Sequence, residues 1–323
     1  MSSTPEILIL TDGKIGDLVQ CRGVASRIST QKATQEKVVK PDWFHALPLP
    51  FMPVARSERR GQPDSPLNGD MPDLILASGR RTIPYLRAFR KLRGGRPLPL
   101  IVFLKDPRAG RGAADFVWAP VHDRLTGDDV LATHTSPHGF TQSRIDEARA
   151  AGKKRFAGEH APIAGIILGG DSGSVRWDSE MSSQFAAQLA DLPNKWTLLV
   201  TPSRRTPAVL KNAVADAISS RPHWIWDGEG DNPYLQILTI ANRLIVTGDS
   251  HNMVSECLAF AKPVYVFRPK GLQNKLHSFL DAMTQRNAVK SIGQFAEPFS
   301  AEPIDATDEI VTAIGKKLES ISN

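Results

Sequence analysis

Residues 244–267 read LIVTGDSHNMVSECLAFAKPVYVF. The apolar run at 244–246 predicts a buried strand, because short uninterrupted apolar runs are typical of strands covered on both faces. A polar loop follows, then a helical pattern over 253–260 and a second apolar run over 264–267. Strand, loop, helix and strand in this order predict a parallel sheet covered by helices.

The same alternation extends over most of the chain. Further apolar runs that predict strands lie at 7–10, 74–77, 100–104, 116–119, 130–133, 163–168, 196–200 and 223–226. A polar, charged stretch at 146–162 divides them into two series. We therefore expect an α/β fold of two Rossmann-like domains facing a cleft, with an N-terminal domain at 1–155 and a C-terminal domain at 156–300. Residues 301–323 are expected to form a closing C-terminal helix.

Length and composition exclude several classes of protein. The 323 residues, 41% of them hydrophobic and 23% charged, suit a two-domain globular protein and not a disordered chain. The two cysteines, Cys21 and Cys257, cannot form a disulfide scaffold and lie in no zinc-type cluster, so no metal is expected. No secretory signal or membrane-length apolar run is apparent, which predicts a cytoplasmic location.

The positive charge is concentrated in one segment. The net charge is +6, and residues 80–111 contain ten Lys or Arg and a single acidic residue, Asp106. Arg80 and Lys105 follow predicted strands and are expected to bind an anionic ligand. The helical part of the segment is expected to be solvated or to contact an anionic membrane peripherally at its inner face. Nucleic acid is not expected, because aromatic stacking residues are not interleaved with the charges.

The loop after the first predicted strand reads TDGKIGD at 11–17. Ligands of open parallel sheets bind beyond the carboxyl ends of the strands, and the two glycines here allow a close approach to the backbone. The loop is neither GxGxxG nor a P-loop. Asp17 is interpreted either as the N-cap of a helix or, with Asp12, as a candidate catalytic carboxylate beside Lys14.

Two loops of the second half suggest a phosphate site. Residues 169–174 read GGDSGS after a predicted strand, so backbone and hydroxyl donors are expected to cradle phosphate, a flexible hairpin being the alternative. Residues 201–205 read TPSRR, where paired arginines are expected to clamp a diphosphate, a solvated pair being the alternative.

The loop TGDSHNMVSE at 247–256 offers further polar groups. Its serine, histidine and asparagine are expected to contact phosphate or sugar. Glu256 is expected in the first turn of the following helix, where it would bind ribose hydroxyls. The alternative is that this glutamate only complements the helix dipole.

These motifs resemble known families. DSHNMVSE at 249–256 with AKPV at 261–264 resembles the C-terminal-domain signature of GT-B glycosyltransferases and nucleotide-sugar epimerases, and KIGDLV at 14–19 resembles a heptosyltransferase segment whose aspartate is a candidate base. TDGKIGD, SGRR, KDPR, GG and TGDS, in this order between residues 6 and 275, resemble the mitochondrial fission ELM-type family. That resemblance implies a GT-B-like fold without assigning a reaction.

The resemblance to GT-B glycosyltransferases implies a metal-independent glycosyltransferase that moves a sugar from a nucleotide-diphosphate donor to an anionic or cell-envelope acceptor, with no cofactor besides this substrate. The alternatives are a nucleotide-sugar 2-epimerase and a non-catalytic scaffold acting through protein or membrane partners. The residues implied for the donor and its phosphates are Gly169, Gly170, Ser172, Arg204, Ser250, His251, Asn252, Glu256, Gln273 and Asn274. Those implied for catalysis are Asp17 and Asp12, and those for the acceptor are Lys14, Arg80 and Lys105.

Overall fold

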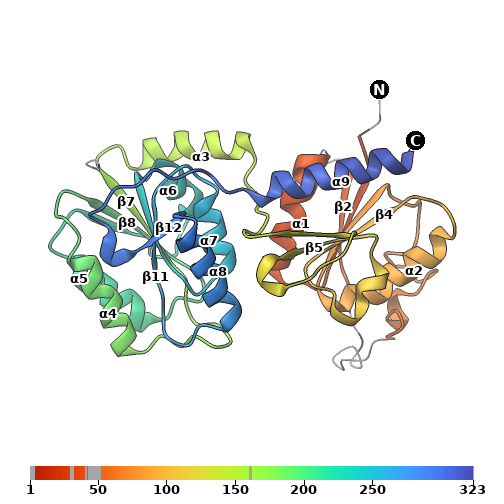
Figure 1. The fold of residues 1–323 in the computed structure, drawn as a ribbon, viewed down its shortest axis with the longest axis horizontal. Coiled ribbons are helices and arrows are strands. Elements are labelled where there is room, and N and C mark those ends of the chain that lie inside the picture. Colours follow the sequence, from red (N-terminus) through yellow and green to blue (C-terminus); the bar gives the residue numbers. More distant parts are fainter. Residues whose placement is uncertain (1–3, 30–32, 41, 43–51, 160–161, 323) are drawn as a thin grey trace. The chain divides into compact units, whose positions relative to one another are not determined.

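The computed structural model describes residues 4–29, 33–40, 42, 52–159 and 162–322. The chain divides into unit 1, formed by Met1–Thr141 with Ala306–Asn323, and unit 2, formed by Gln142–Asp305. Each unit contains a parallel six-stranded sheet with helices on both faces (Figure 1). The α/β fold class predicted from the sequence is therefore confirmed. Among the described residues, no helix has the length and apolar character needed to cross a membrane.

The sheet of unit 1 has the strand order β2-β1-β3-β4-β5-β6. Its strands are β1 (Ile7–Thr11), β2 (Thr34–Val38), β3 (Leu74–Ser78), β4 (Leu100–Leu104), β5 (Phe116–Pro120) and β6 (Val130–Thr133). β1, β3, β4 and β5 are buried along their whole length, which explains their continuous apolar sequences. β2, which the sequence did not predict, is an edge strand with the polar and mostly exposed sequence TQEKV.

Helices cover both faces of this sheet. They are α1 (Ile15–Ile28), α2 (Ile83–Arg93) and α9 (Ala306–Ser322), with the 3-10 turns η3 (Arg56–Glu58), η4 (Arg80–Thr82), η5 (Arg108–Ala113) and η6 (Val121–Asp123). Ile7 and Ile9 face the core beneath α1 and α9, whereas Leu8 and Leu10 face the core beneath α2. The C-terminal helix predicted from the sequence is present as α9, and it packs against α1 in unit 1.

The sheet of unit 2 has the order β12-β11-β10-β7-β8-β9. Its strands are β7 (Ile163–Leu168), β8 (Thr197–Pro202), β9 (His223–Ile225), β10 (Arg243–Thr247), β11 (Val264–Phe267) and β12 (Val289–Ser291). Its helices are α3 (Gln142–Arg155), α4 (Ser179–Ala190), α5 (Ala208–Ile218), α6 (Tyr234–Ile240), α7 (His251–Leu258) and α8 (Asn274–Gln285), with the 3-10 turn η7 (Ile292–Gln294). The expected N-terminal domain ended near residue 155, but α3 packs against α6 and so belongs to unit 2.

Each sheet has one topological switch point, where successive connections leave in opposite directions. It lies between β1 and β3 in unit 1 and between β7 and β10 in unit 2. Ligands of doubly wound sheets bind in the crevice at such points, beyond the carboxyl ends of the strands. The loops selected from the sequence at residues 11–17, 169–174 and 247–256 follow β1, β7 and β10. Arg80, another candidate, follows β3, so all four strands that flank the two switch points lead into a loop with candidate site residues.

Lys262 is a half-buried cation beside α6 in unit 2. Its Nζ donates to the Leu238 carbonyl in the last turn of α6 at 2.7 Å, a position where a cation stabilises a helix. Burial lowers the pKa of Lys262 from 10.5 to about 7, and the nearby charge of Arg149 lowers it further. The unfolded chain therefore binds one more proton than the folded chain between about pH 7 and about pH 10.

Replacing this lysine is expected to change the pH dependence of stability. Because the unfolded state binds the extra proton, the contribution of Lys262 to the free energy of unfolding rises with pH across that window. We expect the melting temperature of Lys262→Met, relative to wild type, to be highest at pH 6–7 and to decline toward pH 10. Thermal melts of both proteins across this range measure the difference, and a difference that does not vary with pH would contradict the burial of a charged Lys262.

Candidate functional site

The two loops at the switch point of unit 2 are joined by hydrogen bonds. The backbone N–H of Gly169 donates to Thr247 Oγ1 at 2.7 Å, and that of Gly170 donates to Asp249 Oδ2 at 2.9 Å. Both acceptors come from the end of β10 and the residues just after it. A Cβ atom on Gly169 would lie 2.2 Å from the Asp249 carboxylate oxygens, so only glycine fits there. Gly169 and Gly170 thus allow the loop after β7 to pack directly against Thr247 and Asp249 at the end of β10.

The following N–H groups are also occupied. Asp171 N donates to the Arg205 carbonyl at 3.1 Å, and Ser172 N donates to the Val175 carbonyl at 3.0 Å. All four backbone donors of residues 169–172 therefore have acceptors within unit 2, and the expected cradle of Gly169 and Gly170 amides is not open in this conformation. The Ser172 hydroxyl accepts from Val175 N at 3.3 Å and keeps its own hydrogen for a ligand. Side chains, not backbone amides, are the donors that this loop presents.

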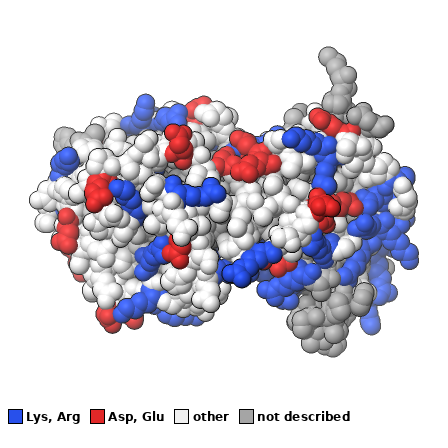
Figure 2. Space-filling view, viewed as in Figure 1, with Lys and Arg blue, Asp and Glu red and all other residues white. Residues whose placement is uncertain are grey.

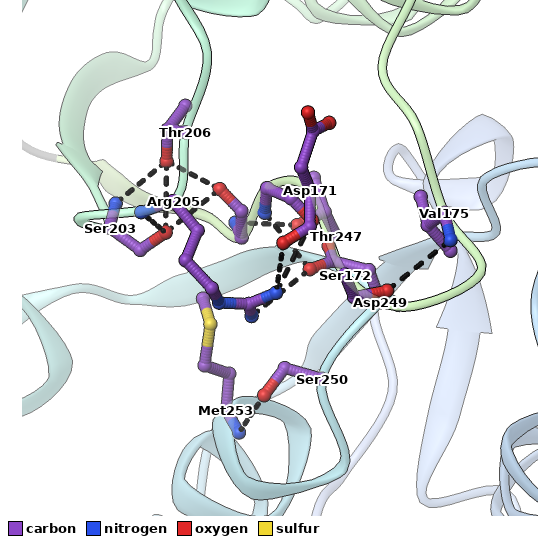
Figure 3. Close-up of polar contacts among 12 residues, drawn as sticks. Asp171, Ser172, Val175, Ser203, Arg205, Thr206, Thr247, Asp249, Ser250 and Met253 are labelled. Atoms are coloured by element: carbon purple, nitrogen blue, oxygen red, sulfur yellow. Dashed lines mark hydrogen bonds and ion pairs between the residues drawn. The ribbon is translucent and has the colours of Figure 1, made fainter. Parts of the chain in front are cut away.

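Arg205 is the arginine that reaches the loop. Its Nη1 donates to the Asp171 carbonyl at 2.7 Å and its Nη2 lies 3.6 Å from Asp249 Oδ2 (Figure 3). Arg204, chosen from the sequence, is exposed and forms no hydrogen bond or ion pair with any described residue. The TPSRR motif could not distinguish the two neighbours. The hydroxyl of Ser203 donates to the Gly169 carbonyl at 2.9 Å and helps to set the direction of this loop.

Asp249 is a central residue of this edge that the sequence analysis did not select. Its side chain is fully buried, and burial raises the pKa of the carboxyl although Thr247, the Gly170 N–H and Arg205 all act to lower it. Its Oδ1 has no hydrogen-bond partner among the described residues. The TGDS motif could have indicated this residue. A carboxylate just after a buried strand at a switch point finds hydrogen-bond donors mainly in the neighbouring loop.

The N-terminus of α7 faces the same edge. Ser250 is its N-cap and accepts from Met253 N at 3.4 Å, so the serine also has the capping role that its position favours. His251 and Asn252, the first two residues of the helix, are half-buried. The His251 ring packs edge-on against Phe279 of α8, with ring centroids 4.2 Å apart.

Glu256 lies in the second turn of α7. We expected it in the first turn, but the helix begins at residue 251, two residues before the apolar pattern that predicted its start. Its Oε2 accepts a hydrogen bond of 2.5 Å from the Tyr234 hydroxyl, the first residue of α6. Burial raises the pKa of Tyr234 well above 10, with the charge of Glu256 adding to the effect, so the phenol remains a donor. Tyr234 therefore fixes the orientation of Glu256, a role that no sequence motif indicated.

Gln273 and Asn274 lie beside the start of α8. Gln273 is the N-cap position and Asn274 the first helical residue, and both are exposed. The turn before them is packed against the loop at residues 169–174, because a Cβ on Gly271 would lie 2.6 Å from the Ser174 carbonyl oxygen. The loops that follow β11 and β7 are thus neighbours, as a shared sugar site would require.

Asp12 is held at the switch point of unit 1. Its side chain is only 3% exposed, and a Cβ on Gly79, directly after β3, would lie 2.4 Å from its carboxyl carbon. Gly79 also has φ of +91°, a conformation that side chains rarely adopt. Lys14 Nζ lies 3.5 Å from Asp12 Oδ2, whereas Oδ1 is buried without a hydrogen bond to a described residue.

Asp17 is the third residue of α1, and Lys14 occupies the N-cap position that the sequence had offered to Asp17. Lys105 Nζ, after β4, donates to Asp17 Oδ1 at 3.0 Å, and Asp17 Oδ2 is buried without a described partner. Arg80 begins η4 after β3 and is exposed. The predicted carboxylates and cations of unit 1 thus all lie at the carboxyl edge of its sheet.

Comparison with known proteins places this fold. The model of the Mitochondrial fission ELM1 family matches residues 16–318. The chain belongs to this family. It is 26% identical over 277 residues to mitochondrial fission protein ELM1 of Arabidopsis thaliana, covering 77% of this chain and 64% of that protein. It is 23% identical over 159 residues to an uncharacterized protein of Rickettsia prowazekii, covering 46% of this chain and 45% of that protein. Both matches span less than two thirds of the relative's length.

Solved structures similar to this ELM1-family chain are GT-B proteins. MurG of Acinetobacter baumannii has a TM-score of 0.56 at 12% identity, over 97% of this chain and 100% of its own. MnaA of S. aureus, solved with UDP, has a TM-score of 0.53 at 12% identity, over 98% of each chain. A UDP-glucosyltransferase from Polygonum tinctorium has a TM-score of 0.51 at 12% identity, over 99% of this chain and 94% of its own. Identities this low show the fold alone, and the expected GT-B-like fold is confirmed.

Proposed function

We propose that unit 2 binds a nucleoside diphosphate sugar and that the chain transfers the sugar to an acceptor bound by unit 1. The observation that carries this proposal is the set of groups at the switch point between β7 and β10. The Arg205 side chain, 44% exposed, the Ser172 hydroxyl and the N-terminus of α7 come together there (Figure 3). An arginine, a hydroxyl and a helix N-terminus are groups that bind phosphate.

The other donor residues have distinct roles. Glu256, oriented by Tyr234, accepts hydrogen bonds from ribose hydroxyls. His251 and Asn252 contact phosphate or sugar. Gln273 and Asn274, at the start of α8, contact sugar hydroxyls. UDP-sugars are the first donors to test, because the similar structures include a UDP complex and a UDP-glucosyltransferase.

The transfer itself uses groups of both units. Asp17, or Asp12, takes the proton of the acceptor hydroxyl as its oxygen forms a bond to the anomeric carbon. The bond between that carbon and the diphosphate oxygen breaks, and the diphosphate leaves with the electron pair. Arg205, in place of the Arg204 expected from the sequence, stabilises the leaving charge without a metal. Lys14, Lys105 and Arg80 attract an anionic acceptor, which in the cytoplasm would be a cell-envelope precursor.

Two alternatives have support of their own. A nucleotide-sugar 2-epimerase is favoured by the likeness to a putative UDP-N-acetylglucosamine 2-epimerase of Listeria monocytogenes, with a TM-score of 0.53 at 12% identity. It would invert the sugar at C2 without an acceptor, so product analysis separates it from a transferase. A non-catalytic scaffold is favoured by the family's name, and it would bind no nucleotide.

Nucleotide binding is tested by thermal shift. UDP or a UDP-sugar at 100 times its Kd is expected to stabilise the wild-type chain by about 2.7 kcal/mol. Glu256→Gln removes a charged acceptor of ribose hydroxyls and is expected to weaken binding roughly 10- to 100-fold, since hydrogen bonds to charged groups contribute about 1.5–3 kcal/mol. Glu229→Gln, on an exposed loop of unit 2, is the matched control and should bind as wild type. If no nucleotide shifts the wild-type melt, the transferase and epimerase proposals both fail and the scaffold remains.

A further inference from the structure

The α2 side of unit 1 carries an excess of positive charge. The segments 52–73, 79–96 and 105–115 contain thirteen Lys or Arg against six Asp or Glu. Figure 2 shows Lys and Arg gathered over the region of α2, at the right of the view. We call the α2 surface the set of exposed cations in these segments that form no ion pair with any described residue, namely Arg56, Arg59, Arg60, Arg80, Arg81, Lys91, Arg96 and Arg108.

Contacts within unit 1 hold these segments in one layer. The Tyr85 hydroxyl of α2 donates to the buried Glu58 carboxylate of η3. Arg90 of α2 donates through Nη1 to the Gly112 carbonyl of η5 at 2.6 Å. The same segments share the hydrophobic core beneath α2. The α2 surface is therefore built on a packed layer and is not a set of cations on separate loops.

The opposite layer is balanced in charge. The segments 12–29 and 306–322, which include α1 and α9, contain five Lys or Arg and five Asp or Glu. Three of these cations form ion pairs, Lys14 with Asp12, Arg22 with Glu36 and Arg27 with Asp308. The positive charge of unit 1 thus lies on one side. Net charge alone favours solubility, so solubility does not explain this uneven distribution.

Among the described residues, the α2 surface has charge but no apolar anchor. The large hydrophobic side chains that are exposed among the described residues are Ile15, Val38 and Val121, and all lie outside its segments. Specific protein interfaces depend on buried aromatic or aliphatic anchors, and single-stranded nucleic acid needs aromatic platforms. A surface of unpaired arginines and lysines instead suits a dense, diffuse array of negative charge, such as anionic lipid headgroups.

We propose that unit 1 docks through the α2 surface on a bilayer that contains anionic phospholipids. Each Lys or Arg that reaches the headgroups should raise the partition coefficient roughly fivefold, the equivalent of about 1 kcal/mol. Binding is electrostatic and so weakens steeply with salt. The proposal does not depend on the proposed enzymatic function, because it requires no nucleotide and no turnover.

Vesicle sedimentation tests the docking with the full chain. Sucrose-loaded vesicles of phosphatidylcholine with 0, 20 or 40% phosphatidylglycerol are mixed with the protein at 50, 150 and 500 mM salt. We expect binding that rises with the anionic lipid and is lost at high salt. The triple variant Arg59→Gln/Arg60→Gln/Lys91→Gln, which avoids the residues proposed to bind the acceptor, should lower the partition coefficient at least tenfold.

A charge-matched control removes the effect of net charge. Lys195→Gln/Lys211→Gln/Arg286→Gln takes three exposed cations from unit 2 and should bind vesicles as wild type does. Equal losses in the two triple variants would overturn the assignment to the α2 surface. Binding that ignores phosphatidylglycerol would overturn the electrostatic mechanism. Duplex DNA that displaces the protein from 40% anionic vesicles at equal charge concentration would identify nucleic acid as the partner instead.

Discussion

Gly170→Ala is expected to abolish nucleotide binding and to lower the free energy of unfolding by about 3 kcal/mol, the upper end of the usual cost of overpacking. A Cβ at this position would lie 2.0 Å from the Arg205 carbonyl oxygen and 2.2 Å from its carbonyl carbon. These are backbone atoms, which cannot rotate away as a side chain can. The loop after β8 must therefore move, and it carries with it the guanidinium proposed to hold the diphosphate.

The loop after β7, which contains Gly170, also provides the control. A Cβ on Gly173 would meet no atom within 4 Å, so Gly173→Ala should melt and bind UDP as wild type does. Chemical denaturation and thermal shift with UDP measure both properties for the two variants. A Gly170→Ala protein that is as stable as Gly173→Ala would show that the two loops are not packed as described.

Arg205→Gln separates binding from folding. Arg205 is partly exposed, and its removal should leave the melting temperature within a few degrees of wild type. Nucleotide affinity should nevertheless fall by at least tenfold, because a charged hydrogen bond to phosphate contributes about 1.5–3 kcal/mol. Arg204→Gln is the neighbouring control and should leave affinity unchanged. The reverse result would favour the arginine that the sequence analysis chose.

The fold could be predicted because the central strands are buried on both faces. β4, β7 and β11 have the bounds that their apolar runs predicted, and residues 163–168 and 264–267 needed no other signal. β2 and β12 were missed because each is a short edge strand in which polar residues are tolerated. Hydrophobic pattern reports burial, so it can lose short edge strands whose sequences are polar.

The candidate site was predicted only in its location. Strand ends and glycines identified both switch points, since those depend on local sequence order. Which donor faces a ligand depends instead on contacts between loops that are far apart in the chain. Arg205 was missed in favour of Arg204, and Asp249 and Tyr234 were overlooked. Their partners Asp171, Gly170 and Glu256 lie 34, 79 and 22 residues away along the chain. The backbone amides of Gly169 and Gly170 were predicted to be free to bind phosphate for the same reason, because their acceptors, Thr247 and Asp249, lie far away in the chain.

Asp17→Asn is expected to slow sugar transfer by about 10²–10⁴-fold, the usual contribution of a general base. The amide is close in shape to the carboxylate and its oxygen still accepts from Lys105, so folding should be retained. UDP should bind the variant as it binds wild type, because the donor site belongs to unit 2. Asp128→Asn, an exposed aspartate of unit 1, is the control and should leave the rate unchanged.

The comparison with Asp12→Asn decides which carboxylate acts. Asp17 retains 10% exposure of its side chain and Asp12 only 3%, and the exposed Lys105 ammonium is bonded to Asp17 Oδ1. A proton acceptor must reach the acceptor hydroxyl, which favours Asp17, whereas Asp12 is packed against Gly79 between the strands. We therefore expect Asp12→Asn to lower the melting temperature and to reduce the rate less than Asp17→Asn does. Rates and melts of the two variants, measured with one donor, give the answer, and the larger rate loss in Asp12→Asn would assign the proton transfer to the buried carboxylate.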